Sequence, residues 1–353
     1  MSLTHRLRLL PIAFVFIIAF CSFIAPLLLR AQDATAPKIR TWTDSQGRKI
    51  NAALLKVDGD NITFSIKGRE VPYQLSKLSD EDQKFIAQWL DIRNPKPLVN
   101  DDGSFTIGED SFKAGDIFTT TLKANDEDRR IADADDLEGI MITIATPADF
   151  DPSKSYPIFV TSTTTSATNA VAAKGNYARV GTPNGFIVIG AQSTTLDIKK
   201  HTYHEARAAT FNRLIKEMVH IWPASKDWPL YFGGFSGGSK NCFFLAGYSM
   251  KELKRPPLGF FMIGSNYSLL DTVRKEYNLS KSDLKHVLYY VCNGTQDKIA
   301  SPQDGQEVVE QLKKAGAKKI RSETYEDGHK FSKEQFDQAL KWFLENTRDN
   351  AEE

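Results

Sequence analysis

The chain has 353 residues, of which 45 are lysine or arginine and 44 are aspartate or glutamate, and its formal net charge is +1. Hydrophobic residues make up 41% and charged residues 25%, which is ordinary for a soluble globular protein with a large domain and a small one. Because there is no basic surplus, we expect no nucleic-acid partner. Three cysteines are too few for a disulfide framework.

Residues 1–31 predict an export signal. His5-Arg6-Leu7-Arg8 is positively charged, residues 9–29 are almost entirely apolar, and Ala31 is a small residue suited to cleavage. The apolar run is long for a signal peptide, so an uncleaved membrane anchor is the alternative. Phe20 before Cys21 argues against a lipoprotein cleavage site. We expect the chain to be exported to the periplasm or the extracellular space, and to contact a membrane only if this segment is retained.

Residues 40–92 predict a small β-rich domain. Short strands are expected on both sides of Gly47, alternating strands over 53–57 and 61–66, and a further strand over 71–75. A helix capped by Ser79 should follow over 80–89, with its apolar residues on one face. Short strands in a module of this size indicate a small β-barrel.

This module resembles the homology domain first described in Sla-type endocytic adaptors, which also occurs near the N-termini of exported bacterial proteins. The resemblance is carried by Arg40, Trp42, Gly47, Ile50, Phe64, Gly68-Arg69, Leu75, Lys77-Leu78-Ser79 and Asp82. In the adaptors the domain has a Src-homology-type barrel and binds short peptide motifs. The resemblance implies a peptide or surface ligand for residues 40–92, and a module that only stabilises or tethers the chain is the alternative.

Residues 93–115 are rich in Pro, Gly and Asp and predict a linker. Residues 116–348 alternate strand and helix patterns, which predicts an α/β domain with an eight-stranded, mostly parallel sheet. The expected strands are 117–122, 140–145, 158–161, 186–190, 230–233, 259–263, 287–292 and 320–325. A helix with 3.6-residue periodicity should lie between the fourth and fifth strands, and Ser301-Pro302 and Ser332 should each begin a helix.

Gly234-Phe-Ser236-Gly-Gly238 lies between the fifth expected strand and an apolar helix, as in a nucleophile elbow. In such enzymes the acid and then the histidine follow at later strand ends. Asp297 follows the seventh expected strand and His329 the eighth. We therefore predict that Ser236 is a nucleophile, that His329 takes its proton, and that Asp297 orients the imidazole.

From Gly139 onward the chain resembles the polyhydroxybutyrate depolymerase and feruloyl or acetyl esterase branch of the α/β-hydrolases. The segments that carry the resemblance are 146–157, Gly233 to Gly238, Asn293-Gly294-x-x-Asp297 and Gly328-His329. The resemblance implies an eight-stranded α/β-hydrolase sheet and ester hydrolysis by a Ser-His-Asp triad, without a cofactor. Members of this branch hydrolyse many esters, so the substrate is not specified.

One segment departs from the family pattern. Members carry His-Gly after the third strand, where a backbone N–H helps to bind the oxyanion, whereas this chain has a run of threonines. Gly237 can supply one N–H, and the second donor would have to come from Thr163 or Thr164. Losing one such donor typically costs about 10²–10³ in rate.

Other chemistry-bearing residues have simpler interpretations. His201 and His204 share a helix face, but no further ligands cluster with them, so no metal site is predicted. The acidic stretch 126–138 is interpreted as a solvated loop. Cys242 and Cys292 are expected to be buried thiols, although a disulfide between them remains open.

The sequence therefore predicts an exported serine esterase with an N-terminal accessory barrel. The short connection between the sixth and seventh strands leaves the site open, which suits an esterified polysaccharide or a polyester. Two alternatives remain. In the first, the chain is a non-catalytic binding protein on a hydrolase scaffold with a remodelled oxyanion loop. In the second, it is a membrane-anchored adaptor in which residues 40–92 carry the function.

Overall fold

The computed structural model describes residues 39–93, 95–164, 173–193 and 203–349. Its packing divides the chain into an N-terminal unit, Met1–Ala87, and a C-terminal unit, Gln88–Glu353. The segment predicted as an export signal lies outside the described residues. Among the helices of the described ranges, none combines the length and the apolar character needed to span a membrane.

The N-terminal unit contains a four-stranded antiparallel sheet in which neighbouring strands follow one another along the chain. A single bridge between Asp44 and Leu78 joins the segment after the first strand to the segment after the fourth. The predicted strands are present, and they form a four-stranded meander whose two ends are joined by this bridge. The elements are β1 (Ile39–Thr43), β2 (Lys49–Asp58), β3 (Asn61–Ile66), β4 (Arg69–Gln74), the 3-10 turn η1 (Leu75–Lys77) and α1 (Asp80–Arg93).

Trp42 is the centre of the core of this unit. Its ring is buried and lies 4.9 Å from that of Phe64 between centroids, and its indole N–H donates to the carbonyl of Ala52. The guanidinium of Arg40 covers the same ring at 4.5 Å and forms an ion pair with Asp82. A tryptophan needs a partner for its N–H when buried, and the strand pairing supplies one.

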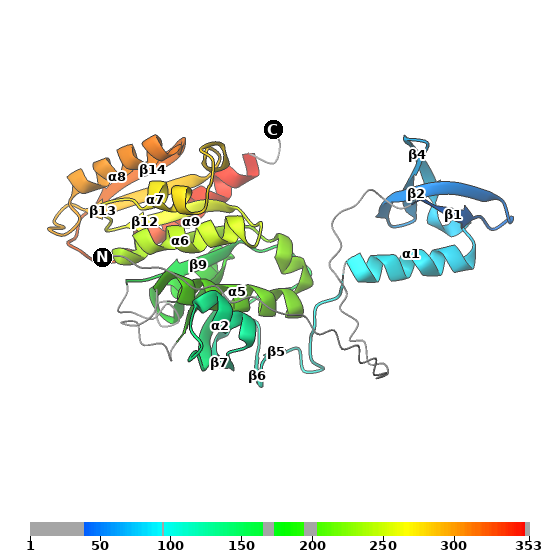
Figure 1. The fold of residues 1–353 in the computed structure, drawn as a ribbon, viewed down its shortest axis with the longest axis horizontal. Coiled ribbons are helices and arrows are strands. Elements are labelled where there is room, and N and C mark those ends of the chain that lie inside the picture. The colour runs from blue at the N-terminus through cyan, green and yellow to red at the C-terminus, as the bar shows by residue number, and fades with distance from the viewer. Residues whose placement is uncertain (1–38, 94, 165–172, 194–202, 350–353) are drawn as a thin grey trace, which may run out of the picture. The chain divides into compact units, whose positions relative to one another are not determined.

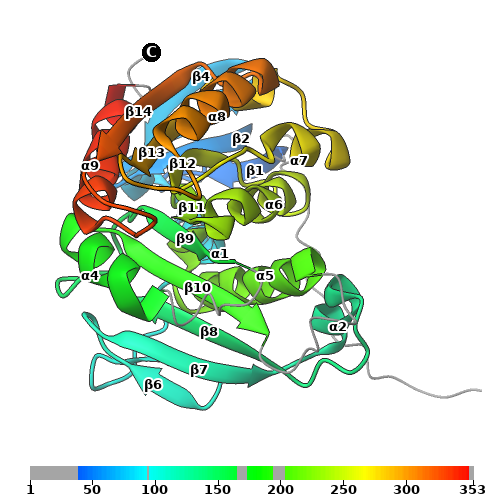
Figure 2. The same ribbon diagram turned by 90° about the vertical axis from the view of Figure 1, so that its left-hand side faces the viewer.

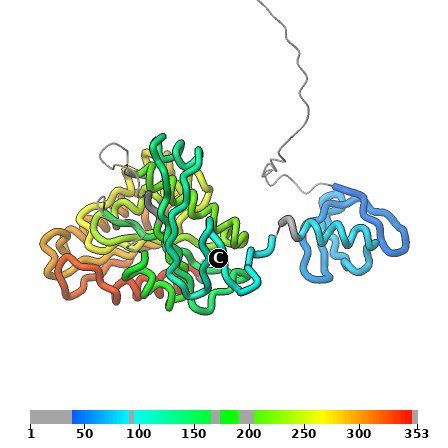
Figure 3. Tube along the Cα trace, turned by 90° about the horizontal axis from the view of Figure 1, so that it is seen from below, coloured from blue at the N-terminus to red at the C-terminus, as the bar shows by residue number. Residues whose placement is uncertain are grey.

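The C-terminal unit is built on an eight-stranded sheet within the described residues, in the order β14-β13-β12-β11-β9-β10-β8-β7. The pairs from β14 to β10 are parallel, whereas β10–β8 and β8–β7 are antiparallel. All eight predicted strands are present, and Figure 3 shows β7 and β8 running side by side. Their bounds are β7 (Ile117–Lys123), β8 (Gly139–Ala145), β9 (Ile158–Ser162), β10 (Ile187–Ser193), β11 (Leu230–Phe235), β12 (Pro257–Ile263), β13 (Leu288–Gly294) and β14 (Lys319–Tyr325).

Helices cover both faces of this sheet (Figures 1 and 2). One face packs against α5 (Tyr203–Ile221), α6 (Gly237–Lys251), α7 (Leu270–Glu276) and α8 (Pro302–Ala315). The other face packs against α4 (Ala178–Gly181) and α9 (Lys333–Asp349). The predicted cap of α8 is confirmed, because Ser301 and Asp304 form a reciprocal capping box. Short turns complete the unit: η2 (Ala173–Tyr177), η3 (Thr182–Asn184), η4 (Pro223–Asp227) and η5 (Ser282–Leu284).

The segment predicted as a linker over 93–115 contains a β-hairpin, formed by β5 (Phe105–Ile107) and β6 (Asp110–Phe112). The side chains of Phe105 and Phe112 are buried and pack edge-on against Trp222 at the end of α5. Aromatic burial of this kind holds the hairpin on the C-terminal unit. The linker prediction is therefore wrong for residues 105–112.

The stretch 126–138, predicted as a solvated loop, begins with a helix, α2 (Asp126–Ala132). Asn125 caps it in a reciprocal capping box with Asp128. Asp128 is fully buried and accepts a 2.9 Å hydrogen bond from Arg213 on α5. One of the acidic residues of this stretch, Asp128, therefore forms an ion pair with Arg213 that links α2 to α5.

Candidate active site

Ser236 is the single residue between the end of β11 and the start of α6, and its backbone has φ 56° and ψ −120°. Positive φ is strained for a residue with a side chain, and such strain is typical of a nucleophile elbow. Gly234 and Gly238 are required because there is no room for a side chain at either position. A Cβ added to Gly234 would lie 2.3 Å from the carbonyl oxygen of Ser162, and one added to Gly238 would lie 2.2 Å from it. The turn is therefore pressed against the end of β9.

The three side chains predicted to act together are brought together. Nε2 of His329 lies 2.9 Å from Oγ of Ser236, and Nδ1 lies 2.7 Å from Oδ2 of Asp297. A carboxylate only accepts, so Nδ1 carries the proton and Nε2 is left to accept from the serine hydroxyl. Phe235 packs against the imidazole with its ring centroid 4.7 Å away. This arrangement can deprotonate a serine as it attacks.

Asp297 is held by the backbone that follows it. Its second oxygen, Oδ1, accepts from the N–H groups of Ile299 and Ala300, both at 2.8 Å. Burial by itself raises the pKa of this carboxyl group. The hydrogen bonds from Ala300, His329 and Ile299 outweigh burial, so the pKa of Asp297 lies below its ordinary value of 3.8. The group is therefore ionised at neutral pH although it is only 4% exposed.

The three predicted oxyanion residues meet at the N-terminus of α6. The first N–H groups of a helix have no partner within it, and no side chain caps α6 at Ser236. A Cβ added to Gly237 would lie 3.2 Å from Cα of Thr164, and one added to Gly238 would lie 2.9 Å from Cα of Thr163. The threonine segment after β9 therefore lies against the first turn of the helix that follows the nucleophile.

Arg207 on α5 holds this threonine segment and was not predicted from the sequence. It is 2% exposed, and within the described ranges it donates four hydrogen bonds of 2.8–3.1 Å to Ser162, Thr163 and Thr164. Asn241 on α6 adds a fifth, from Nδ2 to the carbonyl of Thr163 at 3.0 Å. Burial lowers the pKa of Arg207 to about 9, so the guanidinium stays charged at neutral pH.

A half-exposed surface flanks the triad above β12. Lys240, four residues after Ser236, donates to Asn266 at 3.0 Å and lies 4.1 Å from the ring centre of Tyr267. Asn266 in turn donates to the carbonyl of Ile299, which belongs to the loop that holds Asp297. Tyr267 is 44% and Ile299 61% exposed. Exposed apolar groups beside a nucleophile suit contact with a substrate.

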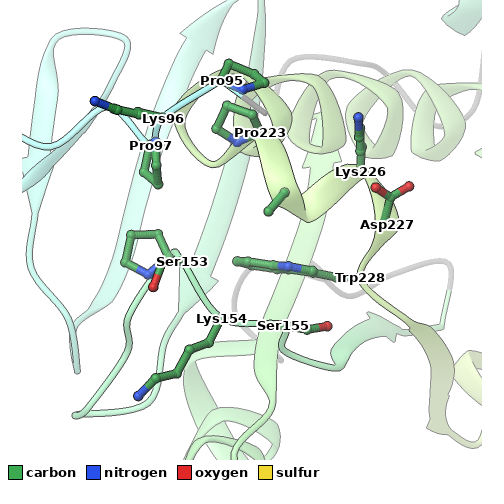
Figure 4. Close-up of a pocket in the computed structure, with 12 residues that line it drawn as sticks. Pro95, Lys96, Pro97, Ser153, Lys154, Ser155, Pro223, Lys226, Asp227 and Trp228 are labelled. Carbon is green, nitrogen blue, oxygen red and sulfur yellow. The ribbon is translucent and has the colours of Figure 1, made fainter. Parts of the chain in front are cut away.

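A cavity of about 490 Å³ lies elsewhere in the C-terminal unit. Figure 4 shows Trp228 between Pro223 and Ser155, with lysines at the rim. These residues precede β9 and β11, so the cavity opens at the amino ends of the strands, whereas Ser236 follows a carboxyl end. In open α/β sheets ligands bind at the carboxyl ends. This cavity is therefore not part of the candidate active site.

Cys242 and Cys292 are both buried and free, as the sequence predicts, and burial raises the pKa of each thiol. Protonated thiols do not compete with Ser236 as nucleophiles. His204 stacks on Phe244 with ring centroids 3.5 Å apart, and His201 lies outside the described residues. Within the described ranges, no cluster of three or more His, Cys, Asp or Glu side chains could hold a metal ion.

No protein-family model matches this sequence, and no curated protein matches it. Similar solved structures include a fungal esterase from Rhizomucor miehei, with 14% identity and a TM-score of 0.48 over 66% of this chain and 84% of that one. A ferulic acid esterase has 14% identity and a TM-score of 0.47 over 65% and 98%. A truncated carbohydrate esterase from gut microbiota has 13% identity and a TM-score of 0.45 over 67% and 99%.

The class of the C-terminal unit follows from its own topology. The sheet is mostly parallel, helices cover both faces, and the strained serine follows β11 between strand and helix. The acid and the histidine follow β13 and β14, in the chain order of this fold. The C-terminal unit therefore has an α/β-hydrolase fold.

Proposed function

We propose that this chain is an exported serine esterase. The observation that carries the proposal is the single imidazole of His329, hydrogen-bonded to Ser236 through Nε2 and to Asp297 through Nδ1. The three residues come from three separate strand ends, so their convergence is a property of the fold. Structural networks of Ser, His and Asp seldom also place the serine at a strained turn beside a helix N-terminus.

The reaction would proceed in two steps. Oγ of Ser236 attacks the ester carbonyl while its proton passes to Nε2 of His329, and the carbonyl oxygen becomes an oxyanion. The carbonyl–alkoxy bond then breaks, and the leaving alcohol takes the proton from His329. Water attacks the acyl-enzyme with His329 again as base, which releases the acid and restores Ser236. Asp297 stays ionised and stabilises the imidazolium in both steps.

The oxyanion would be bound by backbone N–H groups at the N-terminus of α6. Gly237 provides the first donor, and the positive end of the helix dipole favours negative charge at that point. Thr163 or Thr164 provides the second, in place of the His-Gly segment typical of the resembling family. No cofactor takes part in this scheme.

We propose an esterified polysaccharide or a polyester as the substrate. The exposed surface at Tyr267 and Ile299 supports a bulky substrate, because it extends the site beyond the triad without a covering domain among the described residues. For the N-terminal unit we propose a peptide or surface ligand. A cavity of about 270 Å³ in that unit, lined in part by Ile50, Phe64 and Tyr73, supports this assignment.

The test is hydrolysis of p-nitrophenyl acetate and butyrate by the full chain without residues 1–31. Ser236→Ala should reduce kcat by about 10⁶-fold. Ser280→Ala, at an exposed serine, is the matched control and should leave kcat unchanged. A fluorophosphonate probe should label wild type at Ser236 and fail to label Ser236→Ala.

The same experiment separates the two alternatives from an esterase. A binding protein on a hydrolase scaffold, or an adaptor that acts through its N-terminal unit, would show neither turnover nor labelling in wild type. Labelling without turnover would mean that the nucleophile is active and that the substrate differs from simple esters. Turnover that persists in Ser236→Ala would refute the proposed site.

A further inference from the structure

Arg207 is an unusual residue in the wall behind the candidate active site. Burying a guanidinium is costly unless its donors are hydrogen-bonded. Nη1 donates to Oγ of Ser162 at 3.1 Å and to the carbonyl of Thr163 at 2.8 Å. Nη2 donates to Oγ1 of Thr163 and to the carbonyl of Thr164, both at 2.9 Å. All four bonds therefore go to one segment of three residues.

These bonds set the orientation of a peptide plane. The carbonyl of Thr163 accepts from Arg207 and also from Asn241, so its direction is fixed from two sides. In a trans peptide the next N–H points the opposite way to the carbonyl. The N–H of Thr164 is therefore aimed away from Arg207 and Asn241. The charged guanidinium on the carbonyl also polarises this peptide unit, which strengthens its N–H as a donor.

The segment is also packed against the nucleophile elbow. A Cβ added to Gly237 would lie 2.8 Å from Cγ2 of Thr164, and the carbonyl of Ser162 limits the space at Gly238 in the same way. Arg207 thus grips the segment from α5 while the first turn of α6 meets it from the side of Ser236. A threonine segment held in this way has a defined position without the glycine of the family pattern.

We propose that Arg207 is a positioning residue that fixes the N–H of Thr164 as the second oxyanion donor. The inference rests on the proposed function, because an oxyanion forms only if Ser236 attacks an acyl group. Arg207 acts through the threonine segment and not by contact with the substrate. The N–H of Thr164 is selected over that of Thr163 because it belongs to the peptide unit whose carbonyl both Arg207 and Asn241 hold.

The test compares Arg207→Met and Arg207→Lys with wild type on p-nitrophenyl acetate. Arg207→Met removes all four bonds, and kcat should fall about 10²-fold, the lower bound for loss of one oxyanion donor. KM should change less than threefold, because the donor acts on the transition state and not on the bound ester. Arg207→Lys keeps the charge and fewer bonds, so its kcat should lie between the two.

Arg255→Met is the matched control. Arg255 also donates to two backbone carbonyls, those of Ser225 and Trp228, but at the amino end of β11. Its loss should lower the melting temperature and leave kcat within twofold. If Arg207→Met does not fold, Asn241→Ala and Arg207→Lys decide the question, since each should lower kcat severalfold at unchanged KM.

Three results would overturn the inference. Folded Arg207→Met with wild-type kcat would show that the segment needs no such support. A rise in KM at unchanged kcat would assign Arg207 to substrate binding, and equal losses in Arg207→Met and Arg255→Met would assign it to stability alone. Loss of kcat in Ser236→Ala together with wild-type kcat in Arg207→Met would refute this inference and leave the proposed esterase intact.

Discussion

Two side chains of opposite charge are buried on the two sides of Ser236, and each makes two hydrogen bonds to backbone groups. Asp297 follows β13 and accepts from two N–H groups, whereas Arg207 donates to two carbonyls after β9. In the order of the sheet, β13 and β9 lie on either side of β11, which directly precedes Ser236. Backbone dipoles thus help to compensate both charges, together with the hydroxyls of Ser162 and Thr163 at Arg207 and the imidazole of His329 at Asp297. Each charge fixes a segment that the proposed reaction uses.

The first way to test this comparison is to remove the negative charge. Asp297→Asn should lower kcat about 10⁴-fold, because an amide favours the wrong tautomer of His329 and does not stabilise its cation. Its Nδ2 would also face N–H groups if it took the place of Oδ1. The measurement is kcat and KM for p-nitrophenyl acetate, with KM expected to stay within threefold of wild type.

Asp327→Asn is the control for this substitution. Asp327 lies two residues before His329, caps the N–H of Gly328 and pairs with Lys330 at 3.0 Å. Asp327 belongs to the same loop as His329, but the hydrogen bonds of the imidazole go to Ser236 and Asp297. The kcat of Asp327→Asn should therefore stay within threefold of wild type. A kcat above one tenth of wild type in Asp297→Asn would contradict the orienting role of Asp297.

The acid and base side was predictable because its signals are local. Ser236, Asp297 and His329 each come within a few residues of the end of a predicted strand, and parallel strands bring their carboxyl ends to one edge. The alternation of strand and helix patterns and the N-terminal cap of α8 also depend on residues that are close together in the sequence. The sequence therefore sufficed for the eight strands and for the residues now joined by hydrogen bonds.

The other side was not predictable because its contacts are long-range. Arg207 is a polar residue in an apolar helical pattern, and its partners lie more than 40 positions earlier in the chain. The hairpin 105–112 was not predicted because the surrounding Pro, Gly and Asp residues indicate a linker. Only the burial of its aromatic residues shows that it belongs to the core. For α2 a signal existed, namely Asn125 before the acidic run, but the charges suggested a loop.

A second test compares glycines on the two sides of the site. Alanine normally favours a helix over glycine by up to about 1 kcal/mol, yet Gly238→Ala should destabilise the protein. The new Cβ would lie 2.2 Å from the carbonyl oxygen of Ser162, and neither backbone can move cheaply. Because the threonine segment must shift, kcat should fall about 10²-fold, as for a misplaced catalytic group.

Gly328→Ala is the matched substitution beside His329. Its Cβ would meet only the carbonyl oxygen of Gln296, at the ordinary distance of 3.8 Å. Its kcat and melting temperature should therefore stay near those of wild type. The pair is measured by thermal denaturation and ester turnover, and equal losses in both variants would show that the tight contact at Gly238 does not control the site.

The smallest expected effect concerns stability at acid pH. The pKa of Asp297 is lower in the folded chain than its ordinary value of 3.8, so its ionised form stabilises the fold above that pH. This contribution is lost as the pH falls from 3.8 through the folded-state pKa. Asn at this position does not titrate, so the melting temperature of wild type minus that of Asp297→Asn should shrink between pH 6 and pH 3. A difference that grows on acidification would mean that burial outweighs the hydrogen bonds from Ile299, Ala300 and His329, and that the two buried charges are not held in equivalent ways.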